Sequence, residues 1–267
     1  MKPRLGVVSY LNTRPLVFAL ERDPAPFALS YSVPSRCAVD LTAGTVDVGL
    51  IPSIEYARSA DPYYIVPDVA IGTRGLVLTV RLYFRGDLNR IERVALDLSS
   101  RTSVALVRIL LREKFGLDPH FVDAEPDLDA MLATADAALL IGDPVFAVPD
   151  KACASLDLGA DWVELTGLPF VFAFWAGRRE ALSPQQVQIL VAAKEEGLDH
   201  IEEIALAYSK ECGGDPVLYE CYLRRHIDFD LDAAALDGLR AFYAKACAHG
   251  LIAAVPELRF YAREDGV

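Results

Sequence analysis

Short apolar runs alternate with amphipathic stretches along the first two thirds of the chain. Apolar runs of about four to eight residues are typical of buried strands, and apolar residues about three or four positions apart are typical of helices. The predicted strands are residues 5–8, 27–33, 46–51, 93–98, 120–122, 137–141 and 168–175, with a long β-rich segment at 75–84, and the predicted helices are 15–21, 35–43, 101–115 and 128–134. Strands that alternate with helices predict an α/β fold with parallel sheets buried on both faces.

The last third of the chain has a different pattern. Residues 183–186 form the Ser-Pro-Gln-Gln start of a capping box, and apolar residues follow at helical spacing as far as Tyr208. A second helix is predicted from 215–216 to His226, and a third over 233–249. We therefore predict a helical C-terminal third.

Two α/β units joined by extended crossings, near residues 78–85 and 170–177, predict a two-lobed fold with a central cleft. The expected domains are residues 1–82 with 176–267 as lobe 1, including the C-terminal helices, and residues 83–175 as lobe 2. Ligand sites in open α/β sheets lie beyond the carboxyl ends of the strands. A small molecule is therefore expected between the lobes.

Two clusters of polar side chains follow predicted strands where such a site would form. The first contains Ser9, Asn12 and Thr13, and the second contains Ser100, Arg101, Thr102 and Ser103. Both lie at helix starts, where unpaired N–H groups and a partial positive charge attract carboxylates or phosphates. Ser and Asn also cap helices without any ligand, and Arg101 fits a carboxylate clamp as well as a surface ion pair, so these alternatives stay open.

Two further positions have competing interpretations. Asp143 precedes Pro144, a pattern typical of a helix N-cap, although a buried carboxyl with a raised pKa would also suit a general acid. The segment 167–175 is rich in aromatic residues, which are more often core than ligand contacts. Because it follows Pro169, Phe170 is predicted to face the pocket, while Phe172 and Phe174 are predicted to be core.

Composition narrows the classes of function. The 267 residues are 53% hydrophobic and carry a formal net charge of −12, which disfavours nucleic-acid and anionic-membrane partners. No apolar run is long enough to span a bilayer, and the N-terminus does not resemble a secretory signal, so we expect a cytoplasmic protein. The five cysteines and four histidines show no ligand spacing, so we expect reduced thiols and no metal site.

Several segments together resemble the chorismate dehydratase family. They are Val8-Ser-Tyr-Leu-Asn-Thr-Arg-Pro-Leu16, Ser35-Arg-Cys-Ala38, the run from Gly44 to Ser53 followed by Glu55-Tyr56, Ser99-Ser-Arg-Thr-Ser103, and Ile141-Gly-Asp143. The resemblance implies a periplasmic-binding-protein-like fold of type II, no cofactor, and conversion of chorismate, a dicarboxylate, to 3-(1-carboxyvinyloxy)benzoate and water in the futalosine route to menaquinone. Dihydroxynaphthoate synthase of the same route shares the fold, but the opening Ser-Tyr-Leu-Asn-Thr motif favours the dehydratase.

The polar clusters and this resemblance together define the expected site. Asn12 and Ser9 are the expected catalytic residues, and the expected substrate-binding residues are Thr13, Ser53, Thr79, Ser100, Arg101, Thr102, Ser103, Gly142, Asp143 and Phe170. Thr79 stands where the family pattern tends to have serine. Because neither cluster contains a histidine or a pair of carboxylates, we hypothesise that the enolpyruvyl carboxylate of the substrate is the base. A binding protein without turnover is the alternative from another class, and a monomer and a homodimer both stay open.

Overall fold

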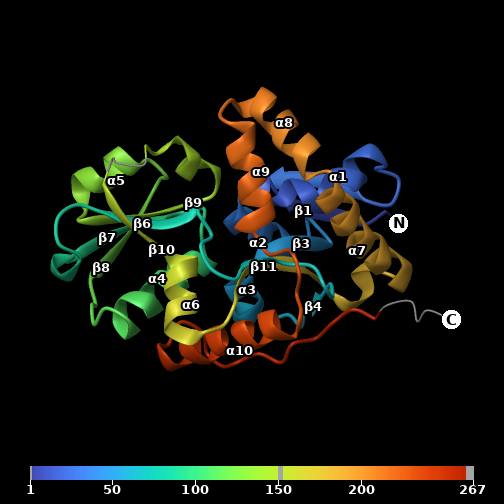
Figure 1. The fold of residues 1–267 in the computed structure, drawn as a ribbon. Coiled ribbons are helices and arrows are strands. Elements are labelled where there is room, and N and C mark those ends of the chain that lie inside the picture. Colours follow the sequence, from blue (N-terminus) through green and yellow to red (C-terminus); the bar gives the residue numbers. More distant parts are fainter. Residues whose placement is uncertain (1, 150–152, 263–267) are drawn as a thin grey trace.

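The computed structural model describes residues 2–149 and 153–262, and it contains two β-sheets flanked by helices (Figure 1). The first sheet has the order β2–β1–β3–β11–β4, with β5 also paired to β11, and the second has the order β10–β6–β9–β7–β8. The predicted two-lobed α/β fold is confirmed. We call the part built on the first sheet the first lobe and the part built on the second sheet the second lobe.

The first lobe begins with alternating strands and helices, as the sequence pattern predicts. These elements are β1 (Arg4–Val8), α1 (Arg14–Arg22), β2 (Ala28–Ser32), α2 (Pro34–Thr42), β3 (Val48–Pro52), α3 (Ser53–Arg58), β4 (Tyr64–Ile65) and β5 (Ile71–Thr73), with the short helix η1 (Leu11–Thr13) after β1. β1 is parallel to β2 and β3, but β11 (Phe170–Gly177) is antiparallel to β3, β4 and β5. The sheet that was expected to be parallel is therefore mixed.

The second lobe is also mixed. Its elements are β6 (Val80–Phe84), η2 (Leu88–Arg90), β7 (Arg93–Asp97), α4 (Thr102–Glu113), β8 (His120–Ala124), α5 (Leu128–Thr134), β9 (Ala137–Ile141), η3 (Asp143–Ala147), β10 (Ala154–Asp157) and α6 (Leu158–Thr166). β7 is parallel to β8 and β9, whereas β6 is antiparallel to β9 and β10. The predicted long β segment 75–84 is interrupted, because Leu78 has a φ of 70° just before β6 begins.

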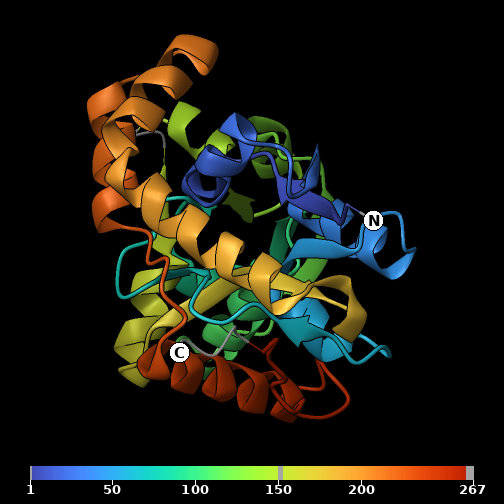
Figure 2. The ribbon, with the colours of Figure 1, turned by 90° about the vertical axis from the view of Figure 1, so that its right-hand side faces the viewer.

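The C-terminal helices surround the first lobe, as Figures 1 and 2 show. They are α7 (Pro184–Asp199), α8 (Ile201–Cys212), α9 (Pro216–Arg225) and α10 (Ala233–Ala248), and the short helix η4 (Arg179–Ala181) precedes them. The capping box predicted at Ser183 is present, since its side chain accepts from Gln186 N and Gln186 bonds back to Ser183 N. In Figure 1, α10 passes beneath both lobes.

A continuous cluster of buried apolar side chains extends through both sheets, so the lobes share one core. A second, smaller cluster lies in the second lobe around Met131 and Leu140. The domain division predicted from the sequence stays a prediction. Its limits at residues 82/83 and 175/176 fall inside β6 and β11, whereas the chain passes between the sheets before each of these strands begins.

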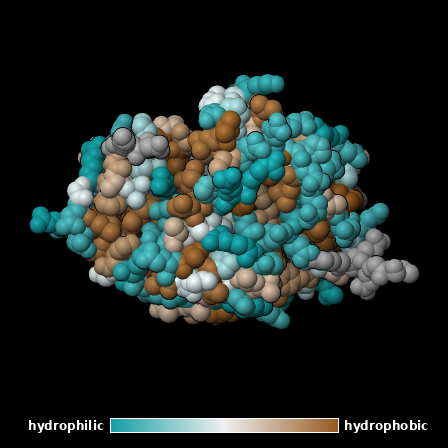
Figure 3. All heavy atoms as spheres, in the orientation of Figure 1, coloured by the Kyte–Doolittle hydropathy of each residue, from teal (hydrophilic) through white to brown (hydrophobic). Residues whose placement is uncertain are grey.

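No helix among the described residues is both long and apolar enough to cross a membrane. Figure 3 shows hydrophilic and hydrophobic residues interspersed on the face that it presents.

Candidate functional site

A cavity of about 560 Å³, which includes open solvent at its mouth, lies where the two sheets meet. Its walls come from the ends of β1, β3 and β9, from the segments that follow β1, β2, β7 and β9, from the start of β6, and from β5 and β11. Parallel strands end at one edge of their sheet, so the polar turns that follow them are brought together. The cavity is lined by several of the predicted site residues, namely Asn12, Thr79, Ser100 to Ser103 and Gly142.

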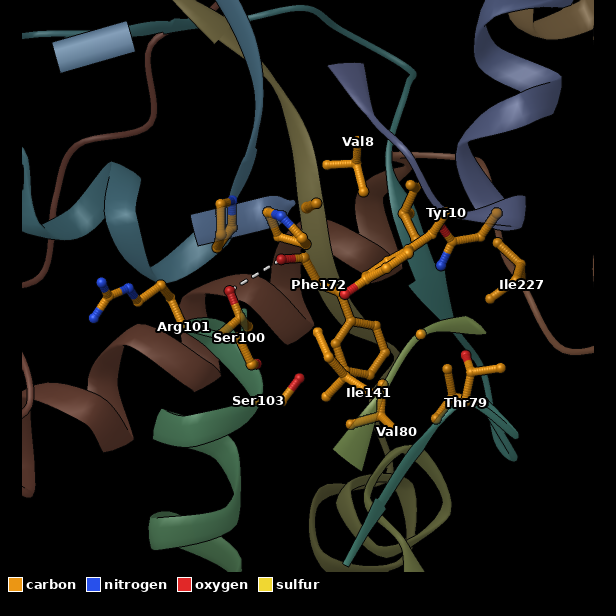
Figure 4. Close-up of a pocket in the computed structure, with 18 residues that line it drawn as sticks. Val8, Tyr10, Thr79, Val80, Ser100, Arg101, Ser103, Ile141, Phe172 and Ile227 are labelled. Carbon is orange, nitrogen blue, oxygen red and sulfur yellow. Dashed lines mark hydrogen bonds between the residues drawn. The ribbon is translucent and has the colours of Figure 1, made fainter. Parts of the chain in front are cut away.

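The start of α4 forms a polar wall of the cavity. Among the described residues, the backbone N–H groups of residues 101–104 meet no hydrogen-bond acceptor, and no side chain caps this helix. The hydroxyl groups of Ser100 and Ser103 likewise have no partner in the described ranges, although both residues are buried. Unpaired donors at a helix start suit a carboxylate. In Figure 4 the Arg101 guanidinium points away from the middle of the pocket.

Thr102 has a structural role in the same wall. Its hydroxyl donates to the carbonyl of Phe172 at 3.0 Å, the contact drawn in Figure 4, and accepts from Ile54 N at 3.3 Å. Because one contact belongs to β11 and the other to α3, this hydroxyl ties α4 to the first lobe. The expected ligand contact of Thr102 must therefore compete with backbone partners.

Asn12 and Thr79 meet at one buried tyrosine. Asn12 Nδ2 donates to the Tyr222 hydroxyl at 3.1 Å, and Thr79 Oγ1 lies 2.8 Å from the same hydroxyl oxygen. Tyr222 is on α9 and has no exposed surface. Its burial raises its pKa, so the phenol stays protonated. Tyr222 could not be predicted as a site residue, since nothing in the sequence around it marks a residue that contacts Asn12 from the far end of the chain.

A second hydrogen-bond chain ends at the Tyr10 side chain. The Tyr10 hydroxyl is 3.1 Å from Ser99 Oγ, and Ser99 Oγ donates to Asp97 Oδ1 at 2.6 Å. Because the single hydroxyl proton of Ser99 goes to Asp97, the Tyr10 hydroxyl is the donor to Ser99. Burial raises the pKa of Asp97 and raises that of Tyr10 to about 12. The oxygen of Tyr10 is left as an acceptor toward the cavity that this residue lines.

Gly142 and Asp143 join the lobes beside the cavity. Gly142 has a φ of 68°, and a Cβ added there would lie 2.5 Å from the Tyr10 ring, so only glycine lets the ring pack here. Asp143 does not line the cavity. Its carboxylate accepts from Leu11 N at 3.0 and 3.1 Å and from the Tyr208 hydroxyl at 2.6 Å. Burial raises the pKa of Asp143, while these hydrogen bonds oppose that rise.

Four other predicted site residues also lie outside the cavity lining, namely Ser9, Thr13, Ser53 and Phe170. Ser9 is exposed and its hydroxyl donates to Ser32 O at 3.2 Å, so it does not meet the pocket. Thr13 and Ser53 are fully buried, and Ser53 Oγ donates to Val171 O at 2.8 Å. A short hydroxyl side chain after a strand can bond a distant backbone carbonyl as readily as a ligand, and the sequence pattern does not distinguish the two.

Phe172 lines the cavity, whereas Phe170 is fully buried among aromatic rings, the reverse of the expectation. The pairing of β11 with β5 shifts register between Val171 and Ala173, which places Phe172 at an irregularity in the strand. Bulges often redirect a side chain next to a functional site. The sequence gives no sign of the bulge. The apolar wall also includes Val8, Ile71, Val80, Ile141 and Ile227.

None of the described residues that line the cavity is an Asp, Glu, His or Cys. Within the described ranges, groups of three or more such side chains able to hold a metal ion are not found anywhere in the fold. The chemistry that this arrangement can perform is orientation and hydrogen bonding of an anionic molecule with an apolar body.

A cavity between two mixed α/β lobes, with helix starts at its rim, places this chain in the class of periplasmic-binding-protein-like folds. The fold matches a solved structure of an Archaeoglobus fulgidus protein at a TM-score of 0.77 and 20% identity, covering 94% of this chain and 98% of the other. It also matches the Escherichia coli periplasmic aliphatic sulphonate binding protein at a TM-score of 0.65 and 18% identity, covering 96% and 94%. At such identities the likeness concerns the fold alone.

The sequence comparisons identify the family. Residues 3–248 match the model of a family described as "Menaquinone biosynthesis". The chain is 34% identical over 260 residues to the chorismate dehydratase of Thermus thermophilus, and the match covers 89% of this chain and 93% of the relative. This chain therefore belongs to the menaquinone biosynthesis family.

Proposed function

We propose that this protein is a chorismate dehydratase, a cofactor-free lyase of the cytoplasm that converts chorismate to 3-(1-carboxyvinyloxy)benzoate and water. The observation that carries the proposal is the cavity between the lobes, whose unpaired donors at the start of α4 suit a carboxylate and whose wall is otherwise largely apolar. The likeness to the Thermus thermophilus enzyme supports the same substrate.

The cavity has distinct sides for the parts of such a substrate. In Figure 4, Ser100 and Ser103 lie on one side, Thr79 lies on the other, and the rings of Tyr10 and Phe172 lie between them. A carboxylate of chorismate would be held at the start of α4, and its ring would lie against the aromatic side chains. Asn12 and Thr79 would then contact polar groups at the other end.

The reaction removes the ring hydrogen beside the ether and the neighbouring hydroxyl group. The carbon that bears this hydrogen is joined through a ring double bond to the carbon that carries the carboxylate. The negative charge that forms on it when the proton leaves therefore spreads into the carboxylate. Donors fixed around a carboxylate would stabilise this charge without reorganising during the reaction. Expulsion of the hydroxyl then makes the ring aromatic, which supplies the driving force.

The substrate itself would supply the base. The described lining of the cavity has no carboxylate or imidazole, whereas the enolpyruvyl group of chorismate carries a carboxylate close to the hydrogen that must leave. The proton would move to that carboxylate, the carbon–oxygen bond to the hydroxyl would break, and the departing oxygen would leave as water after taking up a proton. Asn12 and Thr79 would orient the reacting groups and donate to the oxygen that leaves.

The test is turnover of chorismate by purified protein treated with a chelator, with substrate and product followed by chromatography and mass spectrometry. We expect one carboxyvinyloxybenzoate for each chorismate consumed. Asn12→Ala should lower kcat by about 100-fold, the order expected when a positioned group is lost. Asn89→Ala is the matched control, because Asn89 is exposed on η2 and its side chain donates to Asp87, away from the cavity lining. Tight binding of chorismate without product would instead indicate a binding protein.

A further inference from the structure

The Tyr222 hydroxyl joins two cavity residues that come from different segments. It contacts Asn12 after β1 and Thr79 before β6, at 3.1 and 2.8 Å. The Tyr222 ring is itself fixed, since Phe146 on η3 packs edge-on against it with ring centroids 5.1 Å apart. A rigid side chain with no exposed surface therefore holds both polar groups.

The number of protons defines the direction of each hydrogen bond. Asn12 donates its Nδ2 proton, so the phenol oxygen is an acceptor for that bond. The phenol has one proton of its own, and Thr79 Oγ1 is the acceptor within its reach among the described residues. A buried hydroxyl without an acceptor is costly, so Tyr222 donates to Thr79. The proton of Thr79 is then directed elsewhere, toward the cavity that this residue lines.

The backbone before Thr79 is strained in a way that supports the same geometry. Leu78 has a φ of 70°, unusual for a residue other than glycine, and Thr79 N donates to Val77 O at 2.9 Å in a tight three-residue turn. Asp157 holds this turn, because its carboxylate accepts from Val77 N at 3.1 Å and Leu78 N at 2.8 Å. Strain of this kind persists only where surrounding contacts enforce it, and it clusters at functional sites.

We propose that Tyr222 is a positioning residue, which orients the Asn12 carboxamide and the Thr79 hydroxyl so that both donate to the same bound substrate. The expected effect of Tyr222 on turnover rests on the proposed dehydratase function. Loss of the Tyr222 hydroxyl frees Thr79 to rotate its proton away and removes the acceptor that fixes the Asn12 amide. Both donors then lose their alignment with an oxygen whose charge grows during the reaction, which lowers kcat more than it changes KM.

The first experiment compares Tyr222→Phe with Tyr56→Phe in the full chain. Tyr56 is a matched control, because it is also buried and its hydroxyl makes two hydrogen bonds, donating to Glu257 O at 2.8 Å and accepting from Arg259 N at 3.0 Å, away from the cavity lining. We expect Tyr222→Phe to lower kcat about 10- to 100-fold with KM changed less than about threefold, and with a loss of Tm similar to that of the control. Equal kcat in the two variants would overturn the proposal.

A double-mutant cycle tests whether Tyr222 acts through its partners. In the background of Asn12→Ala with Thr79→Val, the further change Tyr222→Phe should lower kcat less than about threefold, because no donor is left to align. A full loss in that background would show that Tyr222 acts independently and would refute the positioning role. Thr79→Ser keeps the hydroxyl and should retain most activity, and it serves as the test if Tyr222→Phe does not fold.

A readout without turnover separates this inference from the proposed function. The side-chain amide resonance of Asn12, identified by its loss in Asn12→Ala, should show slow proton exchange in the wild type and at least about tenfold faster exchange in Tyr222→Phe. Tyr56→Phe should leave the exchange unchanged. Unchanged exchange in Tyr222→Phe, or fast exchange already in the wild type, would overturn the inference. Slow exchange in a wild type that does not convert chorismate, with faster exchange in Tyr222→Phe, would overturn only the proposed function.

Discussion

Replacement of Gly142 by alanine tests how closely the two lobes meet beside the cavity. Gly142 has a φ of 68° and a ψ of −152°, and an added Cβ would lie 2.5, 2.7 and 2.8 Å from three carbons of the Tyr10 ring. Such distances are too short for carbon atoms, which separate at about 3.5–4.0 Å. The ring would therefore have to move by about 1 Å, which takes its hydroxyl away from Ser99.

The expected loss of stability has two parts. A backbone conformation that is essentially confined to glycine costs on the order of 1–3 kcal/mol. Overpacking against the ring adds about 1–3 kcal/mol. The sum is about 2–6 kcal/mol, and each kcal/mol lowers Tm by about 2–4 °C in chains of about this size. Because Tyr10 lines the cavity, its displacement should also lower kcat by about 100-fold.

Gly116→Ala is the matched control in thermal denaturation and chorismate turnover. Gly116 has the same φ of 68°, but an added Cβ would meet nothing within 4 Å. This variant should lose only the backbone contribution, about 1–2 kcal/mol, and keep wild-type kcat. If the two variants had the same Tm and the same kcat, the packing of Tyr10 on Gly142 would be refuted.

Two other sets of variants give separate expectations. Asp143→Asn should lower the free energy of unfolding, measured by urea denaturation, by about 1–3 kcal/mol, since one of the donors to the carboxylate loses its acceptor. Because burial raises the pKa of Asp143 above its ordinary 3.8, the folded state favours the protonated carboxyl, and this contribution to stability is fully present below pH 3.8 and is lost as the pH rises through the folded pKa. The stability of the wild type relative to Asp143→Asn should therefore decline as the pH rises through this range, and an increase would contradict the assignment. Thr102→Val leaves the Phe172 carbonyl and the Ile54 N–H without their partner, so it should lower the free energy of unfolding by about 1–3 kcal/mol and lower Tm accordingly. Ser103→Ala should raise the KM for chorismate with little change in Tm, and the reverse ranking of the two variants would contradict their assigned contacts.

The elements with strong local signals could be predicted from the sequence. The helix start at Ser183 follows from hydrogen bonds between neighbours in the chain, so its capping box is present as predicted. The buried strands β7 and β9 also begin and end close to their predicted limits. The antiparallel pairing of β11 and the short strands β4, β5 and β10 were missed, because pairing depends on residues far apart in the chain.

The residues of the candidate site likewise divide into those that could be predicted from the sequence and those that could not. The serines at the start of α4 were predictable, since a polar run after a buried strand marks the edge of the sheet. Ser53 and Thr13 carry the same signal, yet they are buried away from the cavity lining, because a hydroxyl type does not indicate which partner it will find. Tyr222 has no local signal, and only the packing of α9 brings it to Asn12.

Contacts between the lobes explain how a cavity with few charged groups could favour a reaction of a dianion. Leu11 N–H bonds Asp143, Tyr10 bonds Ser99, and Ser35 N donates to the Ser99 carbonyl at 3.1 Å, each joining the two lobes. Exchange of such bonds for water costs only about 0.5–1.5 kcal/mol each, so these three bonds oppose opening of the cavity to a substrate by only a few kcal/mol. Closure then excludes water, which strengthens every hydrogen bond from Asn12, Thr79 and the α4 start to the bound anion. In a cavity that excludes water, well-oriented hydrogen-bond donors can therefore stabilise a bound anion as charged side chains do in a solvent-exposed site.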